Sequence, residues 1–528
     1  MTGAPDKAKL RKNVSLGHAF WQIGSLTAVS RIVGFARDIA FASFLGAGSA
    51  ADAFLVALKL PNMFRRLTAE GAMTNAFLPS FTKLRTAEGR VAAMGLAAEA
   101  QIILILVLFG IVILAEIFMP QILMLLAPGF VATPDRFAAA VDLGRVTMPY
   151  LPMISIVALW IAIANAHDQF MAGAAAPIVA NICFIAGAIS IPLFADDLGI
   201  FQALPIAFGL LVAGLLQLAF LYMVLSRLSA LPKLQMPHLS DAGRAMWRNF
   251  IPSALGAGGM QLNLLVDLIL ASLLPVGAIS WLYFADRVVQ LPLGIVGIAL
   301  GTALLPRLST AEADEQRVDF TKALDEAIIF AGFFVVPAMI SLIILAGPII
   351  EGLFVYGAFT TDDAVMAAMA LSAYAFGLPG FVLVKILQPA FYAAGHPGAV
   401  LKVSIMTIVI NITGSLILMP LFGHVGLALA TSLSGLIAGV VMVVLLRRSR
   451  RLGGSCLGMM GRILLATMVM SIFLVFLANF GSELRLIMPA AFWLAGQIAL
   501  GGAAFLTAAF FLKAIPAGLL RRWWHRKT

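Results

Sequence analysis

The sequence predicts an all-α polytopic membrane protein with about fourteen transmembrane helices. Hydrophobic residues make up 62% of the 528-residue chain, charged residues make up 11%, and the mean hydropathy is +1.02. A water-soluble domain needs more polar surface than this composition supplies. The apolar stretches at 102–118, 206–225 and 403–418 are continuous rather than alternating. They therefore predict helices and not the strands of an outer-membrane barrel.

Apolar windows of about 20 residues place the predicted helices in chain order. The predicted spans are 20–45, 51–80, 93–118, 138–165, 172–195, 200–226, 247–274, 278–305, 320–346, 363–390, 399–421, 424–446, 459–480 and 486–512. Two further apolar segments, 120–130 and 348–358, are too short to cross a bilayer. We predict that they lie at the interface, each at the same place in its half of the chain.

The distribution of lysine and arginine predicts the orientation in the membrane. One side collects the basic residues of segments 7–12, 83–90, 227–248, 307–322, 447–451 and 521–527. The opposite side carries little beyond Arg136, Arg145 and Arg485. Because cytoplasmic loops are enriched in basic residues, both termini are predicted to be cytoplasmic. The basic start has no small-residue cleavage pattern, so we expect no signal peptide.

Cysteine, histidine and net charge exclude several classes of function. Cys183 and Cys456 lie in separate apolar segments, and the six histidines lack metal-ligand spacing. We therefore expect neither a disulfide framework nor a zinc site. The net charge of +10 is explained by the basic loops, so no nucleic-acid partner is predicted.

An internal repeat divides the chain into two halves. The segment that begins Asp38-Ile-Ala-Phe-Ala-Ser is echoed by Asp267-Leu-Ile-Leu-Ala-Ser, and a glycine follows ten residues after each aspartate, as Gly48 or Gly277. The repeat predicts two pseudo-symmetric six-helix lobes around a central cavity, with two additional C-terminal helices. The predicted parts are a tail 1–14, an N-lobe 15–228, a linker 229–241, a C-lobe 242–448, a basic loop 449–458, helices 13 and 14 at 459–512, and a basic tail 513–528.

Charged side chains lie inside several predicted spans. Helices 1, 2, 7 and 8 contain Arg31, Arg37, Asp38, Asp52, Lys59, Arg65, Arg66, Glu70, Asp267, Asp286 and Arg287. An arginine at the bilayer centre costs about 2.5–3.5 kcal/mol on insertion scales, so these groups are expected to face protein or water.

Two interpretations of these charges stay open. In the first, acids and bases neutralise one another, because Arg37 is next to Asp38 and Arg66 is four residues from Glu70. In the second, the surplus of arginine in helices 1 and 2 binds an anionic ligand. The guanidinium fork donates parallel hydrogen bonds that suit phosphate. A surplus of arginine therefore favours a phosphate-bearing ligand, whereas an exporter of cations is expected to present carboxylates.

Four segments together resemble the signature of the MurJ/MviN family. They are Ser30-Arg-Ile-Val-Gly-Phe-Ala-Arg-Asp38, Gly46-Ala-Gly-Ser-Ala-Ala-Asp-Ala-Phe54, Lys59-Leu-Pro-Asn-Met-Phe-Arg-Arg66 and Ala69-Glu-Gly-Ala72. In the second lobe, Ser280-Trp-Leu-Tyr-Phe-Ala-Asp-Arg287 and Leu291-Pro-Leu-Gly294 resemble it as well. Members are lipid II flippases of bacterial peptidoglycan synthesis, within the multidrug/oligosaccharidyl-lipid/polysaccharide exporter superfamily.

The resemblance implies a lipid II flippase of the bacterial inner membrane that works by alternating access of its two lobes. It implies that Arg31, Arg37, Arg65 and Arg287 contact the diphosphate and sugars, while Asp38 and Asp52 shape the cavity. The expected partners are lipid II, membrane lipids and the cell-wall synthesis machinery, and the expected state is a monomer.

The resemblance also implies roles for the last helices and for a sodium ion. Helices 13 and 14 are expected to form a groove for a polyprenyl tail, with Phe473, Phe476 and Phe492 available. In some members a sodium ion is held by helices 7, 11 and 12, where this chain offers Asp267, Asn411 and Thr431 as oxygen ligands. Ser415 stands where a second carboxylate would complete a stronger site. No other cofactor is implied.

Three alternatives to lipid II transport follow from the same sequence. The first is an exporter of another polyprenyl-linked glycan or of drugs in the same superfamily. The second is a membrane enzyme that uses the acidic pairs Asp196-Asp197 and Asp362-Asp363, but neither pair has neighbouring bases or histidines. The third, a structural scaffold, leaves the intramembrane arginines unexplained. We therefore expect a transporter and not an enzyme.

Overall fold

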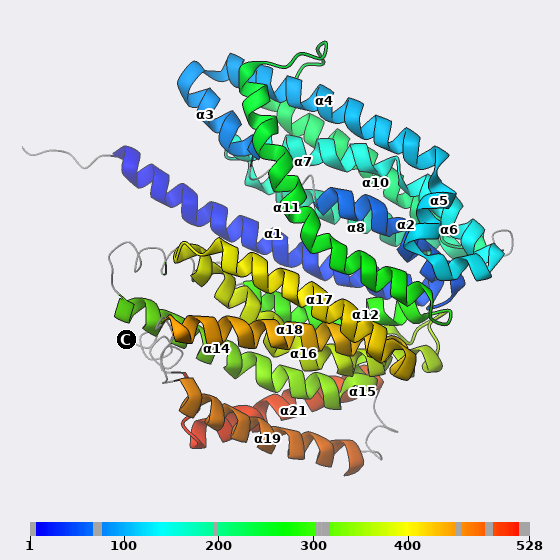
Figure 1. Ribbon diagram of the computed structural model, residues 1–528, viewed down its shortest axis with the longest axis vertical. Helices are drawn as coiled ribbons and strands as arrows, with labels where there is room; N and C mark the ends of the chain where they lie inside the picture. Colours follow the sequence, from blue (N-terminus) through cyan, green and yellow to red (C-terminus); the bar gives the residue numbers. More distant parts are fainter. Residues whose placement is uncertain are drawn as a thin grey trace, which may run out of the picture. The chain divides into compact units, whose positions relative to one another are not determined.

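The computed structural model describes residues 7–66, 76–194, 199–298, 300, 304, 308, 317–449, 456–480 and 489–516 (Figure 1). For 7–24, 252–262, 298, 317–319, 456–457, 480 and 490 it describes the backbone alone. All regular elements over these residues are helices. The chain divides into two compact units, Met1–Val276 and Gly277–Thr528.

The first unit contains the helices up to Ser272. They are α1 (Lys7–Leu45), α2 (Ser49–Arg65), α3 (Leu78–Glu88), α4 (Arg90–Ile117), α5 (Met119–Leu126), η2 (Pro128–Ala132), α6 (Pro134–Thr147), α7 (Tyr150–Ala166), α8 (Phe170–Ser190), η3 (Ile191–Leu193), η4 (Gly199–Phe201), α10 (Leu204–Arg227) and α11 (Asp241–Ser272). Within this unit α1 packs on α8, α8 on α10, and α2 on α6.

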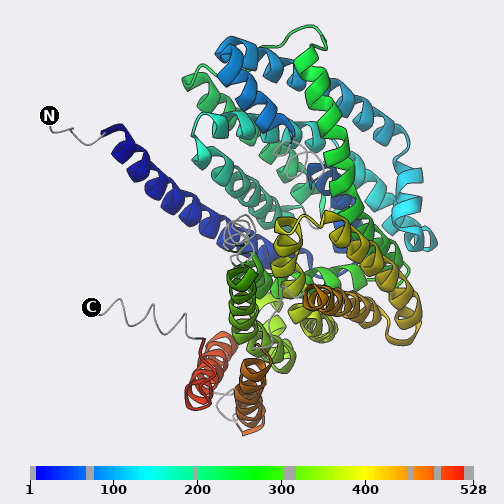
Figure 2. The same ribbon diagram turned by 60° about the vertical axis from the view of Figure 1, so that its left-hand side comes forward.

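The second unit contains the remaining helices. They are α12 (Ala278–Pro292), the π-helix η5 (Leu293–Ile298), α14 (Arg317–Ile344), α15 (Ala346–Phe354), α16 (Thr361–Ala393), α17 (Pro397–Phe422), α18 (His424–Arg448), α19 (Cys456–Phe480) and α21 (Ala490–Phe511). Here α16 packs on α12, α14 and α18. The last two helices, α19 and α21, pack side by side, and α19 also packs on α14 (Figure 2).

Ten helices among the described residues are long and apolar enough to cross a membrane. The predicted spans 51–80, 247–274 and 278–305 contain residues outside the described ones or described by backbone alone, so this criterion does not test them over their full length. The described side chains of α1, from residue 25 to 45, do not meet it, and they include the charges of Arg31, Arg37 and Asp38. These four predicted spans are the ones in which the sequence places intramembrane charge. The predicted all-α polytopic class is confirmed. The two short segments form α5 with η2 and α15, and their place at the interface stays a prediction.

Helix α11 lies in the first unit because both of its ends contact that unit. At its start, the buried Glu99 carboxylate of α4 accepts hydrogen bonds from Ser240 N at 3.3 Å and Ser240 Oγ at 2.6 Å. At its end, Gly129 N of η2 donates to Ser272 Oγ at 3.3 Å. The sequence assigned this helix to the C-lobe, and the lobe boundary at 229–241 stays a prediction.

Small residues bring α16 and α18 into close contact. A Cβ atom on Gly377 would lie 2.6 Å from Ser432 Cα, and a Cβ atom on Gly380 would lie 2.5 Å from the Gly435 carbonyl carbon. Glycine at such positions lets two backbones approach, which is how helices associate without a hydrophobic driving force in lipid. The crossing holds α16, the helix against which α12 packs, in a fixed position within the second unit.

Candidate functional site

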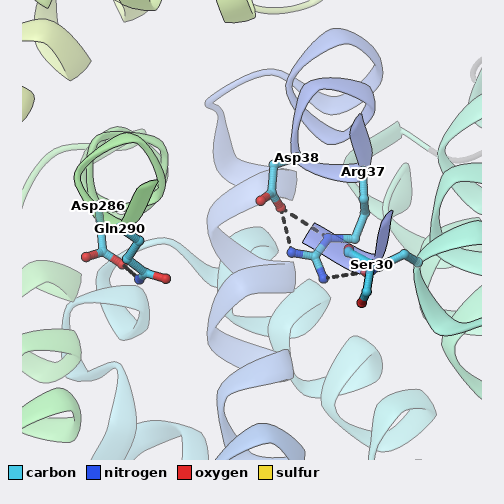
Figure 3. Close-up of polar contacts among 6 residues, drawn as sticks. Ser30, Arg37, Asp38, Asp286 and Gln290 are labelled. Atoms are coloured by element: carbon cyan, nitrogen blue, oxygen red, sulfur yellow. Dashed lines mark hydrogen bonds and ion pairs between the residues drawn. The ribbon is translucent and has the colours of Figure 1, made fainter. Parts of the chain in front are cut away.

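Arg37 of α1 is held by side chains from two helices (Figure 3). Its Nε and Nη2 atoms donate to Asp38 Oδ1 at 3.1 and 2.7 Å, and its Nη1 atom donates to Asn181 Oδ1 of α8 at 3.1 Å. Asn181 Nδ2 in turn donates to the carbonyl oxygen of Ser30 at 3.4 Å. The Arg37 side chain is 22% exposed although Asp38 is buried. The guanidinium is therefore oriented without being sealed from its surroundings.

Aromatic rings support the same arginine from behind. The Arg37 Cζ atom lies 5.3 Å from the centroid of the Phe184 ring, one helical turn beyond Asn181. The rings of Phe41, Phe54 and Phe184 lie 5.7 to 5.9 Å apart, and all three are buried. Their contacts pack α1, α2 and α8 together next to the arginine. The sequence did not point to Asn181 or Phe184, because neither side chain is charged and so neither stands out within an apolar helix.

Asp52 of α2 forms a buried ion pair with Arg136 of α6. Asp52 Oδ2 lies 2.5 Å from Arg136 Nη2, and their side chains are 0% and 4% exposed. The Arg136 Cζ atom lies 3.7 Å from the centroid of the buried Phe130 ring, which screens the pair. The sequence placed Arg136 on the side opposite the basic loops, and this placement stays a prediction, but the structure shows that the side chain is buried inside the first unit. Its partner, 84 residues away, gave no local signal.

The other predicted arginines of the first unit are less enclosed. Arg31 is exposed on α1, and Arg65 is half-buried at the end of α2, next to the exposed Arg66. Glu70, which the sequence paired with Arg66, lies outside the described residues. Within this unit the structure therefore combines one oriented arginine, one buried ion pair and more accessible guanidinium groups.

In the second unit Arg287 is half-buried on α12. Its Cζ atom lies 4.7 Å from the centroid of the Tyr283 ring, one turn earlier on the same helix. The neighbouring Asp286 accepts a hydrogen bond from Gln290 Nε2 (Figure 3). The π-helix η5 follows directly, and such local widening is frequent at functional positions. Substrate binding by Arg31, Arg37, Asp38, Asp52, Arg65 and Arg287 stays a prediction.

Two of the predicted sodium ligands are neighbours in the second unit. Asn411 of α17 is fully buried, and Thr431 Oγ1 of α18 lies 3.2 Å from Asn411 Oδ1. Ser415, one turn after Asn411, is also buried, and its hydroxyl has no hydrogen-bond partner among the described residues. These hard oxygen donors fit a small cation. Asp267 lies on α11 of the other unit, and the sodium site stays a prediction.

The second acidic pair serves at least in part as a helix cap. Asp363 forms a capping box with Thr360 at the start of α16, and its Oδ1 atom accepts from Trp281 Nε1 at 2.8 Å. Asp362 beside it is exposed. The pair Asp196-Asp197 lies outside the described residues. In the last two helices, Phe476 and Phe492 are 53% and 67% exposed, as expected of side chains that face lipid or a lipid tail.

Repeat-related bundles of apolar helices, with arginines carried inside the spans, define a multi-pass membrane transporter. A family model described as lipid II flippase MurJ matches residues 41–516. The chain belongs to this family, which confirms the resemblance seen in residues 30–72.

A relative and one solved structure agree with this assignment, and a second solved structure shares the fold. The chain is 35% identical over 413 residues to a probable lipid II flippase MurJ of Rickettsia prowazekii (strain Madrid E), covering 78% of this chain and 79% of the relative. A structure of a lipid II flippase MurJ in an inward closed conformation superposes with a TM-score of 0.78 at 25% identity, covering 93% of this chain and 98% of that one. An inward-facing multidrug resistance MATE family transporter of the MOP superfamily shares the fold at 14% identity, with a TM-score of 0.65 over 80% of this chain and 94% of that one.

Proposed function

We propose that this protein moves lipid II, a polyprenyl-diphosphate-linked peptidoglycan precursor, from the cytoplasmic to the periplasmic leaflet of the bacterial inner membrane. The observation that carries the proposal is the Arg37 guanidinium, which Asp38 and Asn181 orient while 22% of its side chain stays exposed. Membership of the lipid II flippase family supplies the substrate class. An oriented guanidinium matches the oxygens of a diphosphate.

Orientation matters because a transporter must bind the head group and then release it. A fixed arginine loses little side-chain entropy when phosphate binds, so affinity comes from few contacts. Alternating access of the two repeat-related halves then carries the head group across while the polyprenyl tail stays in lipid. Outward movement of phosphate across an inside-negative potential is downhill by about 2.3 kcal/mol per charge per 100 mV.

Reconstitution tests this function directly. Purified protein in proteoliposomes is expected to expose labelled lipid II on the opposite leaflet, and rapid inactivation in cells is expected to leave the precursor on the cytoplasmic leaflet. Arg37→Ala and Arg287→Ala are expected to abolish movement without loss of folded protein, and Arg287→Lys to retain little of it. Arg145→Ala is the matched control, because Arg145 is exposed and forms a loose pair with Asp142 at 3.7 Å. Full activity of all three site variants would refute the proposal.

The shared fold with a multidrug transporter favours one second candidate, an exporter of another polyprenyl-linked glycan or of drugs. Depletion separates the two. Loss of lipid II transport halts cell-wall synthesis, whereas loss of the alternative changes surface polysaccharide or drug sensitivity and leaves the wall intact.

The remaining features follow from the same proposal. Both termini lie in the cytoplasm, the protein acts as a monomer beside the cell-wall synthesis machinery, and it catalyses no covalent reaction. Na⁺ is the coupling ion, held by Asp267, Asn411 and Thr431. A sodium gradient is then expected to accelerate lipid II movement in proteoliposomes, and Asn411→Leu to remove that acceleration. Equal rates in sodium and potassium for the unaltered protein would exclude this ion.

A further inference from the structure

The second helix of each repeat begins at an equivalent place. Helix α2 starts at Ser49 and α12 starts at Ala278, each eleven residues after the repeated aspartate, Asp38 or Asp267 (49 − 38 = 11 and 278 − 267 = 11). A glycine precedes each helix directly. Counted from these starts, the fourth residue of α2 is Asp52 and the fourth residue of α12 is Trp281.

These two residues contact equivalent positions of a second helix in their own repeats. Arg136 is the third residue of α6 and pairs with Asp52 at 2.5 Å. Asp363 is the third residue of α16 and accepts from Trp281 at 2.8 Å. Helices α6 and α16 each follow the short apolar segment of their repeat. The contact joins the same two first turns in both units.

An aromatic or imidazole ring supports each contact, and in the second unit a helix cap supports it as well. Phe130 lies 3.7 Å from the Arg136 Cζ atom in the first unit. In the second unit the rings of Trp281 and His424 are 5.1 Å apart, and Thr360 fixes Asp363 through N and Oγ1 at 3.0 and 2.7 Å. The contact lies at the same position in both units, but its chemistry differs. In the first unit it is an ion pair, and in the second an indole N–H donates to a carboxylate.

This difference in chemistry decides between two roles for Asp52. If Asp52 bound the head group, nothing would require a hydrogen-bonding indole at the equivalent position of the other repeat. A tie between two first turns needs only a complementary donor and acceptor, and both contacts supply one. Each tied helix carries a predicted substrate arginine farther along, Arg65 on α2 and Arg287 on α12.

We propose that Asp52–Arg136 and Trp281–Asp363 are duplicated clasps whose role in transport is to position the arginine-bearing helices α2 and α12 for the phosphate head group. Asp52, Arg136, Trp281 and Asp363 are then positioning residues, and for Asp52 this role replaces the substrate contact that the resemblance implies. This inference rests on the proposed function, since it assigns the clasped arginines to lipid II.

A double-mutant cycle on each clasp tests the idea with the full-length protein in proteoliposomes and lipid II as the probe. The variants are Asp52→Asn, Arg136→Met and their combination, then Trp281→Phe, Asp363→Asn and their combination. Each single change is expected to raise the half-saturating lipid II concentration about tenfold, and each combination to act no more strongly than its worse single change. Asp362→Asn and Arg145→Gln, which alter exposed charges on the clasped helices α16 and α6, are expected to stay within about twofold of the unaltered protein.

Amide hydrogen exchange gives a second measurement that does not depend on transport. Exchange in the first turn of α2 should rise in Asp52→Asn and Arg136→Met but not in Trp281→Phe, and the reverse should hold for α12. Trp281→Phe keeps an aromatic ring at this position but removes the five-membered part of the indole with its N–H donor, so it tests clasp formation with a conservative change.

Several results would overturn the clasps. If Asp52→Asn is as harmful in the Arg136→Met background as in the unaltered protein, Asp52 contacts the substrate directly. Unchanged exchange at the first turns also overturns the proposal. If the unaltered protein moves no lipid II, the proposed function fails by itself, and the positioning role for that substrate fails with it, whatever the exchange data show about the contacts.

Discussion

Replacement of Asn181 by leucine tests whether orientation of Arg37 matters for transport. Leucine has the same number and branching of side-chain heavy atoms as asparagine but cannot accept the hydrogen bond from Arg37 Nη1, which is 3.1 Å long, or donate the 3.4 Å bond to the Ser30 carbonyl oxygen. The change therefore removes the hydrogen bond between α8 and the arginine, while the two bonds to Asp38 and the contact with the Phe184 ring stay.

The magnitude follows from the bond that is lost. A hydrogen bond to a charged group contributes about 1.5–3 kcal/mol, whereas the longer bond to Ser30 adds little. Because Asp38 still holds the guanidinium, we take the lower end of that range. A loss of about 1.5 kcal/mol corresponds to roughly a tenfold drop in transport rate at subsaturating lipid II.

The assay is lipid II movement in proteoliposomes at equal amounts of folded protein. Asn165→Leu is the matched control in the same unit, because the buried Asn165 Oδ1 atom has no hydrogen-bond partner among the described residues. We expect that control to transport at the rate of the unaltered protein. Equal rates for Asn181→Leu and Asn165→Leu would refute the view that α8 orients Arg37.

Three further outcomes are expected. Gly380→Ala places a Cβ atom 2.5 Å from the Gly435 backbone, so it should destabilise the protein by about 1–3 kcal/mol, seen as a lower melting temperature in detergent, and an unchanged temperature would contradict the tight crossing. Gly243→Ala places a Cβ atom against the Glu99 carboxylate, so it should speed amide exchange at the start of α11, whereas exchange like that of the unaltered protein would show that this end is not clamped. Arg287→Lys keeps the charge but loses the planar fork over the ring, so transport should fall about tenfold or more, measured against protein of equal melting temperature, and near-normal transport would argue that a point charge suffices.

Local sequence patterns predicted much of the architecture. Continuous apolar stretches determine where helices cross a membrane, since a lipid environment leaves the backbone few other choices. The echo of Asp38 at Asp267 revealed the repeat, and the short segments at 120–130 and 348–358 were found because they lack the length to span. The dense signature at residues 30–72 identified the family, and the charged residues within it indicated the candidate site.

The partners of those charges were decided only by tertiary structure. Arg37 and Asn181 are 144 residues apart, Asp52 and Arg136 are 84 apart, and Trp281 and Asp363 are 82 apart. Such pairs depend on which helices pack together and how each is rotated, and neither property is carried by the composition of one helix. The sequence therefore indicated no partner for Arg136, whereas packing of α6 on α2 buries it beside Asp52. The sequence determines which charged groups must be shielded from lipid. The packing of the helices determines which side chains pair with those groups.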